Sequence, residues 1–376
     1  MSGARTATAA MIALACLLVA GCGSKPAPAA SLPKPPAPPP LATSFASTGG
    51  ASWTVVQMGG SAAQENNFWQ VFLRPTAVAS WRQVTPLGVA DNGGLVVASP
   101  GSGSLVTAFR PSQLLTYTPL AASTDNGASW SPAGPLNAGL AAGPNALAAG
   151  PGGQLIALTS DGTKAELGQG LGATWTRLAT VSSLNATSAG KACQVTGLTA
   201  AAFSGSTPLL AASCGRAGTA GIFARTGGTW RAAGPPVSGD TVDVLGLAAS
   251  GTGLVALLRA TAGTSASIIG AWYSGGRWTL SSPLRIGAGK LGSTAIGPAG
   301  SLGVTWDGTR GATLAGPGAS WRALPTLPKW AATLALGSQV AVIAADGQTF
   351  RDYQLASGGW SLAQTVHVQI PYGSSG

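Results

Sequence analysis

Side chains that perform acid–base chemistry or bind metal ions are scarce in this sequence. Of its 376 residues, 10 are Asp or Glu, and the single histidine is His367. A Ser-His-Asp triad would depend on that histidine, and no nucleophile-elbow pattern accompanies it. A zinc site needs three or four His, Cys or carboxylate ligands, and no glycine-rich phosphate loop leads from a strand into a helix. We therefore expect no metal and no cofactor.

Charge and helical periodicity are also scarce. Charged residues make up 8% of the chain, and its net charge of +10 arises because 20 Lys and Arg outnumber the acids. The basic residues form neither a run nor an amphipathic helix, so nucleic-acid binding is not predicted. No long stretch after residue 25 has helical periodicity, whereas the 56 Gly and 26 Pro favour tight turns between short strands. The composition predicts an all-β protein.

The N-terminus has the pattern of an export signal. Arg5 precedes a short apolar run, residues 9–20, which is too short to span a membrane and is typical of a signal peptide. Residues 19–22 (VAGC) then resemble the bacterial lipobox, where cleavage occurs before the cysteine and its sulfur takes a lipid. The resemblance implies lipidation of Cys22. The alternative is an ordinary secretory signal with an incidental cysteine.

A tether follows the lipobox. Residues 24–43 are rich in Pro and Ala, a composition that favours an extended polyproline II spacer. We expect a signal peptide over residues 1–21, a lipidated cysteine and disordered tether over residues 22–44, and a folded body over residues 45–376. This order predicts an extracytoplasmic monomer held at the cell membrane by its lipid.

Two cysteines remain in the body once Cys16 is lost with the signal peptide. Cys193 and Cys214 flank a predicted hairpin with a Ser-Gly turn, which would place them opposite each other on neighbouring strands. An even cysteine pair in an exported chain favours a disulfide. Two free buried thiols, or half of a metal site, are the alternatives.

Tryptophan recurs near the ends of short strands, with a glycine just before it. From Trp130 onward the spacing is roughly 40 to 55 residues, a period typical of a four-stranded β-propeller blade. We predict seven blades, with eight as an alternative; the tryptophans that mark the blade ends are Trp81, Trp130, Trp175, Trp230, Trp278, Trp321 and Trp360. Trp53 would then belong to a strand that completes a blade with the C-terminal strand near residues 365–370.

Three Asp-Gly pairs recur at one position of the repeat. Asp161, Asp307 and Asp346 each precede a glycine at the same distance before the tryptophan of their unit. Asp-Gly favours a two-residue hairpin turn with positive φ at both positions. These aspartates are therefore interpreted as turn residues between the second and third strands.

One copy of the repeat carries a longer motif. Ser123, Asp125, Gly127 and Trp130 resemble the Asp-box, or BNR repeat, of sialidase-like propellers. The resemblance implies that the aspartate caps a turn through backbone N–H groups and that the tryptophan packs between blades. It is therefore structural, and the other copies keep Gly and Trp but lose the Asp.

The sialidase resemblance also implies an arginine triad, a tyrosine assisted by a glutamate, and an aspartate. Residues 72–75 (FLRP) lack the isoleucine of the expected Arg-Ile-Pro motif, and Arg74 is interpreted as an ordinary strand-end residue. The glutamates are Glu65 and Glu166 alone. Because hydrolysis of this kind requires paired carboxylates, we assign no catalytic residue.

A candidate ligand face is predicted where blades are linked. Asp240 and Asp243 lie between the fourth strand of one blade and the first strand of the next, where propeller ligand loops occur; the alternative is a solvated loop. Four tryptophans outside the repeat could stack on sugars or pack in the core: Trp69, Trp272, Trp306 and Trp330. We expect a non-catalytic binding or scaffolding module for an envelope protein or glycan. The alternatives are a diverged sialidase-like glycoside hydrolase and an assembly subunit.

Overall fold

The described part of the chain is built mainly of β-strands. A computed structural model describes residues 44–46, 51–59, 67–76, 79–86, 94–101, 103–109, 120–132, 144–170, 174–216, 218–251 and 253–368. All of them belong to the compact unit Pro38–Gly376. Within these residues, no helix has both the length and the apolar character needed to cross a membrane. The predicted signal peptide, Cys22 and most of the predicted tether lie outside the described residues.

The first three blades each contain four antiparallel strands in chain order. Blade 1 holds β1 (Ser44–Ala46), β2 (Ser52–Gly59), β3 (Asn67–Arg74) and β4 (Arg82–Gln83). Blade 2 holds β5 (Leu95–Gly101), β6 (Ser104–Phe109), β7 (Leu120–Ser123) and β8 (Ser131–Pro132). Blade 3 holds β9 (Ala146–Ala149), β10 (Gln154–Thr159), β11 (Lys164–Gln169) and β12 (Thr176–Thr180).

The remaining blades repeat this order after two short helices, α2 (Val181–Asn185) and α3 (Ser188–Cys193). Blade 4 holds β13 (Val195–Ser204), β14 (Thr207–Cys214), β15 (Gly221–Thr226) and β16 (Thr229–Ala232). Blade 5 holds β17 (Thr241–Ser250), β18 (Gly253–Ala262), β19 (Ser265–Ser274) and β20 (Arg277–Leu280), with β21 (Leu284–Gly287) added beside β19. Blade 6 holds β22 (Leu291–Ile296), β23 (Leu302–Trp306), β24 (Arg310–Leu314) and β25 (Arg322–Ala323). Blade 7 holds β26 (Ala331–Leu336), β27 (Val340–Asp346), β28 (Thr349–Ala356) and β29 (Gly359–His367).

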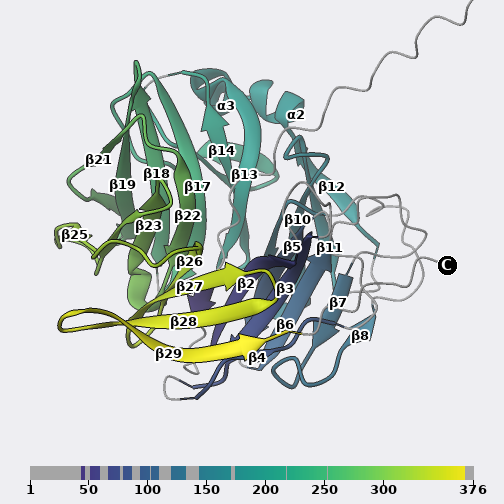
Figure 1. The fold of residues 1–376 in the computed structure, drawn as a ribbon. Coiled ribbons are helices and arrows are strands. Elements are labelled where there is room, and N and C mark those ends of the chain that lie inside the picture. The colour runs from purple at the N-terminus through teal and green to yellow at the C-terminus, as the bar shows by residue number, and fades with distance from the viewer. Residues whose placement is uncertain are drawn as a thin grey trace, which may run out of the picture. The chain divides into compact units, whose positions relative to one another are not determined.

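Neighbouring blades pack side by side through their inner strands (Figure 1). Each strand in the following series contacts the next one: β2, β5, β9, β13, β17, β22 and β26. The last of them, β26, also contacts β1 and β2 of the first blade. Blades 4 and 5 are also hydrogen-bonded, since β14 pairs with β17 and joins them into one nine-stranded sheet. The predicted seven-bladed all-β propeller is confirmed.

The repeated strand order gives the ring two distinct faces. Because each blade runs up and down in the same way, the first strands begin on one face, which we call the strand-start face. That face also carries the links between blades and the turns between second and third strands. The opposite face, which we call the Asp-box face, carries the turns between third and fourth strands.

The ring closes differently from the sequence-based prediction. Trp53 lies in β2, which pairs with β1 and β3, while β29 pairs with β28 in its own blade. The prediction that Trp53 joins the C-terminal strand is therefore wrong, because each chain end supplies a complete blade. Blades 1 and 7 are joined by a backbone hydrogen bond of 2.8 Å from the Gly59 N–H to the Gly347 carbonyl and by side-chain contacts. The rings of Phe72 and Phe350 lie 4.0 Å apart between centroids, and the side-chain amide of Gln364 hydrogen-bonds both the N–H and the carbonyl of Trp81, at 2.7 and 2.8 Å.

The repeat tryptophans stand at the start of the fourth strands and join neighbouring blades. In four of them the indole N–H donates to a backbone carbonyl of the preceding blade or of the link that follows it. These bonds run from Trp130 to Val84, Trp278 to Ala233, Trp321 to Ser282 and Trp360 to Pro325, at 2.7 to 3.3 Å. One side chain thus fills the space between two sheets and satisfies a polar group there.

The Asp-Gly turns lie between second and third strands as predicted, but two of the three are longer than predicted. Thr159 pairs with Lys164 and Trp306 pairs with Arg310, which leaves Asp161 and Asp307 inside wider loops. Only the third, after Asp346 in β27, is a two-residue turn. The wider loops allow both aspartates to reach the start of the first strand in the same blade.

The predicted disulfide is confirmed. Cys193, at the end of α3, is bonded to Cys214 of β14 with a Cα–Cα distance of 4.8 Å, and the hairpin β13–β14 lies between them. Both sulfurs are buried against Gly221, where a Cβ atom would lie 2.8 Å from the Cys214 sulfur. The bond anchors the helical insertion to the junction of blades 4 and 5.

Candidate functional site

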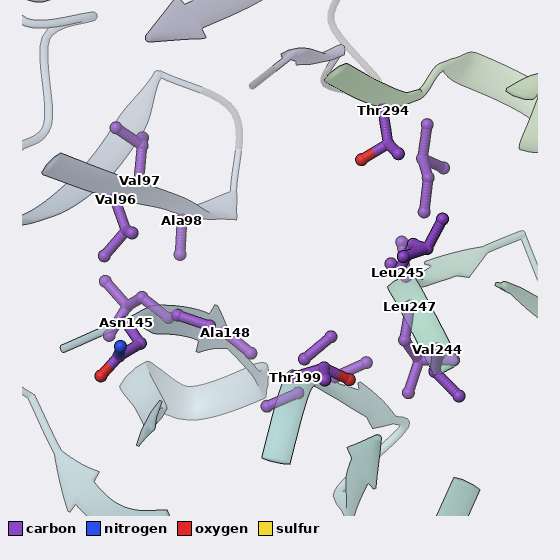
Figure 2. A pocket seen from close by; sticks show the side chains of 18 of the residues that line it. Val96, Val97, Ala98, Asn145, Ala148, Thr199, Val244, Leu245, Leu247 and Thr294 are labelled. Atoms are coloured by element: carbon purple, nitrogen blue, oxygen red, sulfur yellow. The ribbon is translucent and has the colours of Figure 1, made fainter. Parts of the chain in front are cut away.

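The inner strands surround a cavity of about 860 Å³. Five first strands line it, namely β5, β9, β13, β17 and β22, together with Trp53 and Val55 of β2. Most of the lining side chains are small and apolar, and Figure 2 shows them converging from several blades. A cavity of this size and composition is typical of small-molecule sites in proteins.

Three charged residues line this cavity, and two of them, Asp243 and Arg259, form an ion pair; the third is Lys290. Asp243 of β17 is the ladder partner of Arg259 of β18, and the guanidinium Nε and Nη2 both donate to Asp243 Oδ2, at 2.9 and 2.5 Å. Both residues line the cavity, and the Asp243 side chain is 17% exposed. Among the described lining residues Asp243 is the single carboxylate. The cavity wall therefore lacks the paired carboxylates that glycoside hydrolysis requires.

Asp240, the other residue of the predicted ligand face, performs a backbone role. Its Oδ2 accepts the N–H of Gly263, in the turn between β18 and β19, at 2.7 Å. Blade 6 has the equivalent contact with the two positions exchanged. There the aspartate, Asp307, lies in the turn between the second and third strands, and its Oδ1 accepts the N–H of Lys290, just before β22, at 2.8 Å. Asp240 does not line the cavity, so the structure separates it from Asp243.

The Asp-box forms a closed set of hydrogen bonds on the opposite face. Asp125 accepts the Ser129 hydroxyl at 2.5 Å, the Ser129 N–H at 2.9 Å and the Ser123 hydroxyl at 2.7 Å, which together hold the pKa of Asp125 well below its usual range. Gly127 has φ 74°, and a Cβ there would lie 2.8 Å from Val84. These residues shape a turn, and none of them lines the cavity.

A buried polar cluster lies between blades 1 and 7. Arg74 and Asp352 are each 2% exposed and interact electrostatically, and the Arg74 guanidinium carbon is 4.8 Å from the centre of the Trp81 ring. Burial raises the pKa of Asp352, and a hydrogen bond from Gln354 at 3.1 Å opposes that shift. Arg74 thus belongs to the closure of the ring and does not line the cavity.

One tryptophan outside the repeat faces solvent. Trp330 is 49% exposed and lies directly before β26, on the strand-start face. Its φ is 60°, a conformation that bulky residues rarely adopt, and the Lys329 ammonium sits 4.0 Å from the ring centre. Trp272 and Trp306 are buried, each 7% exposed, and Trp69 is half-buried. The described part of the chain holds no cluster of three metal-ligating side chains.

Asp243 was singled out from the sequence, and the residues that surround it were not. Arg259 lies opposite Asp243 because the β17–β18 register shifts by one residue at Leu245, whereas counting from the turn would place Ala260 there. No pattern in the sequence distinguishes the other polar lining residues, which are Ser99, Asn145, Thr199, Ser213, Lys290 and Thr294.

The sequence matches no protein-family model and no curated protein. Among solved structures it is similar to the GH74 enzyme of Niastella koreensis, with 16% identity, a TM-score of 0.57, and coverage of 86% of this chain and 53% of the enzyme. This chain therefore spans about half the length of that enzyme. Two proteins provisionally assigned as 6-phosphogluconolactonases are also similar. The one from Bacteroides uniformis has 11% identity, a TM-score of 0.54, and coverage of 85% and 96% of the two chains. The one from Bacteroides fragilis has 10% identity, a TM-score of 0.52, and coverage of 84% and 95%. These likenesses concern the fold.

Proposed function

We propose that this protein is a cell-envelope lipoprotein whose BNR-like propeller is a non-catalytic module that binds an envelope glycan. In this proposal the lipid on Cys22 holds the chain at the membrane, and the Pro-rich tether carries the propeller away from it. The strand-start face binds the glycan. A protein ligand on the same face is the closest alternative.

The exposed ring of Trp330 is the observation that carries the glycan proposal. An aromatic face stacks on the apolar C–H surface of a sugar, and its exposure in the free protein would be relieved by that contact. Its unusual φ of 60° holds the residue at the edge of the sheet, where its carbonyl accepts the Ala345 N–H at 3.1 Å. Backbone strain maintained at an exposed aromatic residue is a common property of binding sites.

Two observations disfavour the alternative of a sialidase-like hydrolase. The single carboxylate of the described cavity wall, Asp243, is engaged by Arg259. Arg74 is buried between blades 1 and 7. The N. koreensis protein is named as an enzyme, but at 16% identity that name does not extend to this chain.

The glycan proposal is tested by co-sedimentation of the full-length lipoprotein with insoluble polysaccharide from its own envelope, freed of protein by protease. We expect Trp330→Ala to weaken binding about tenfold, which corresponds to the loss of one stacking contact worth about 1.4 kcal/mol. Leu362→Ala is the matched control, because Leu362 is 52% exposed and lies on β29. Equal binding by Trp330→Ala and wild type would contradict the proposal. Binding to the untreated envelope that is lost once protease has removed its protein would favour a protein ligand.

Mass spectrometry of the native N-terminus tests the anchor separately. We expect the mature chain to begin at a diacylglycerol-modified Cys22, and a Cys22→Ser chain to leave the membrane fraction. An unmodified cysteine, or cleavage at another position, would refute lipidation without bearing on the glycan site.

A further inference from the structure

The charged residues of the central cavity all lie at one end of it. Asp243 is near the start of β17, Arg259 is its ladder partner on β18, and Lys290 directly precedes β22. Because the first strands begin at the strand-start face, this is the end of the cavity at that face. The sixth residue after Asp243 along β17, Ala249, lines the other end, roughly 20 Å away. The described lining residues of that end carry no charge.

One positive charge at the strand-start end has no carboxylate partner. Asp243 and Arg259 neutralise each other, and their hydrogen bonds engage only Nε and Nη2 of the guanidinium. Lys290 forms no ion pair with a described residue, since its neighbour Asp307 pairs with Arg310 and accepts the backbone N–H of Lys290. The Lys290 side chain is exposed at the mouth of the cavity. An anion at this end can therefore meet the Lys290 ammonium and the remaining nitrogen of Arg259.

Between its two ends the cavity offers an apolar surface. Val, Ala and Leu side chains form most of the wall, and Figure 2 shows Val96, Ala98 and Leu247 around the open space. At the uncharged end, the hydroxyl of Ser99 is already hydrogen-bonded to backbone carbonyls at 3.0 Å. A charged group placed along this wall would lose its hydration without a compensating partner. The wall therefore suits the apolar part of a ligand.

We propose that the central cavity binds an elongated amphipathic anion. Its apolar part lies along the first strands, where burial of apolar surface supplies the affinity. Its anionic group lies at the strand-start face beside Lys290 and Arg259, which fixes the direction in which the ligand enters. Trp330 does not line the cavity, so this site does not rest on the glycan proposal.

Two fluorescent probes with one shared skeleton test the charge of the ligand. N-phenyl-1-naphthylamine is uncharged, and 8-anilino-1-naphthalenesulfonate is the same molecule with an added sulfonate. The full chain is prepared as Cys22→Ser, so that neither lipid nor detergent micelles compete for the probes. We expect saturable fluorescence enhancement with both. Lys290→Gln should weaken the sulfonate about two- to fivefold and leave the amine unchanged, because it removes one partly exposed charge contact.

The matched control is Lys164→Gln. Lys164 is also an exposed lysine of the strand-start face, at the first position of β11, but it does not line the cavity. Its substitution changes the net charge of the protein by the same amount as Lys290→Gln does. We expect it to leave the binding of both probes unchanged.

The apolar contact is tested with a variant and with a displacement assay. Ala98→Phe should weaken both probes about tenfold or more, because the added ring occupies the cavity. In the wild type, laurate should displace the sulfonate probe, whereas acetate, which has the same carboxylate without the chain, should not. If Ala98→Phe fails to fold by circular dichroism, the displacement assay decides.

The outcomes separate this proposal from the glycan proposal. Trp330→Ala should bind both probes as the wild type does, and loss of probe binding in this variant would overturn the cavity site. The proposal is also overturned by the absence of saturable binding, by equal effects of Lys290→Gln on both probes, or by equal effects of the two lysine variants on the sulfonate. Unchanged binding in a folded Ala98→Phe, or displacement by acetate, would overturn it as well.

Discussion

Removal of the disulfide should lower the stability of the whole propeller by a calculable amount. Cys193 and Cys214 are 21 residues apart in sequence, and their bond closes that loop in the unfolded chain. In the chain-entropy model such a crosslink contributes about 3 kcal/mol. The perturbation is the double variant Cys193→Ala/Cys214→Ala.

The expected shift in melting temperature follows from the size of the folded unit. An unfolding entropy of about 2.1 cal/mol/K per residue, summed over Pro38–Gly376, is about 0.7 kcal/mol/K. A loss of about 3 kcal/mol therefore lowers the melting temperature by about 4 °C. This is a lower bound, because each cysteine is 1% exposed and its truncation also removes packing.

Calorimetry with and without reductant provides the assay. In the folded wild type the disulfide should resist reductant, because both sulfurs are buried against Gly221. Its melting temperature should fall only after the protein has unfolded and refolded in reductant. The double alanine variant should be insensitive to reductant throughout. A variant that melts with the wild type, or a native protein reduced at the rate of an exposed disulfide, would refute the reasoning.

Three further predictions concern the joints between blades. Trp278→Phe should cost about 1 kcal/mol in urea unfolding beyond the loss of ring area, because it removes the bond of 2.7 Å to the Ala233 carbonyl; equal stability of the two proteins would contradict this. Gly127→Ala should lower the melting temperature more than an exposed glycine substitution of ordinary φ, because it adds strain at φ 74° and a contact of 2.8 Å with Val84. Burial raises the pKa of Asp352 above 3.8, so the folded state binds the proton of this carboxyl more tightly than the unfolded state does. The wild type should therefore gain stability relative to Asp352→Asn as the pH falls from the raised folded-state pKa towards 3.8. A stability difference between these two proteins that does not vary with pH would count against that assignment.

The blade count was predictable because one residue type marks each repeat. A tryptophan such as Trp130 is large enough to fill the space between sheets, so its position at the fourth strand is maintained along the chain. Turn lengths were less predictable. Whether Asp307 sits within a tight hairpin or a wider loop depends on its bond to the Lys290 N–H, a contact between segments that local sequence does not encode.

Only a charged residue of the candidate site could be singled out from the sequence. Asp243 stands out in a chain with 10 acids, whereas Thr199 reaches the cavity because a bulge shifts its strand register. Bulge positions depend on packing between neighbouring blades, and a threonine in an apolar strand is common. Trp330 was recognised as lying outside the repeat, but its exposure follows from its backbone conformation at the start of β26.

The closure of the ring determines how the molecule would respond to mechanical load. The first and last blades exchange no strand, and β1 is held to its blade by pairing with β2 over three residues. A pull on the N-terminal side would open this short antiparallel ladder one residue pair at a time, beginning at Ser44. The Phe72–Phe350 stack would then be the next element to bear the force. The junction of blades 4 and 5, which has both a ladder and a covalent bond nearby, should be the last to separate.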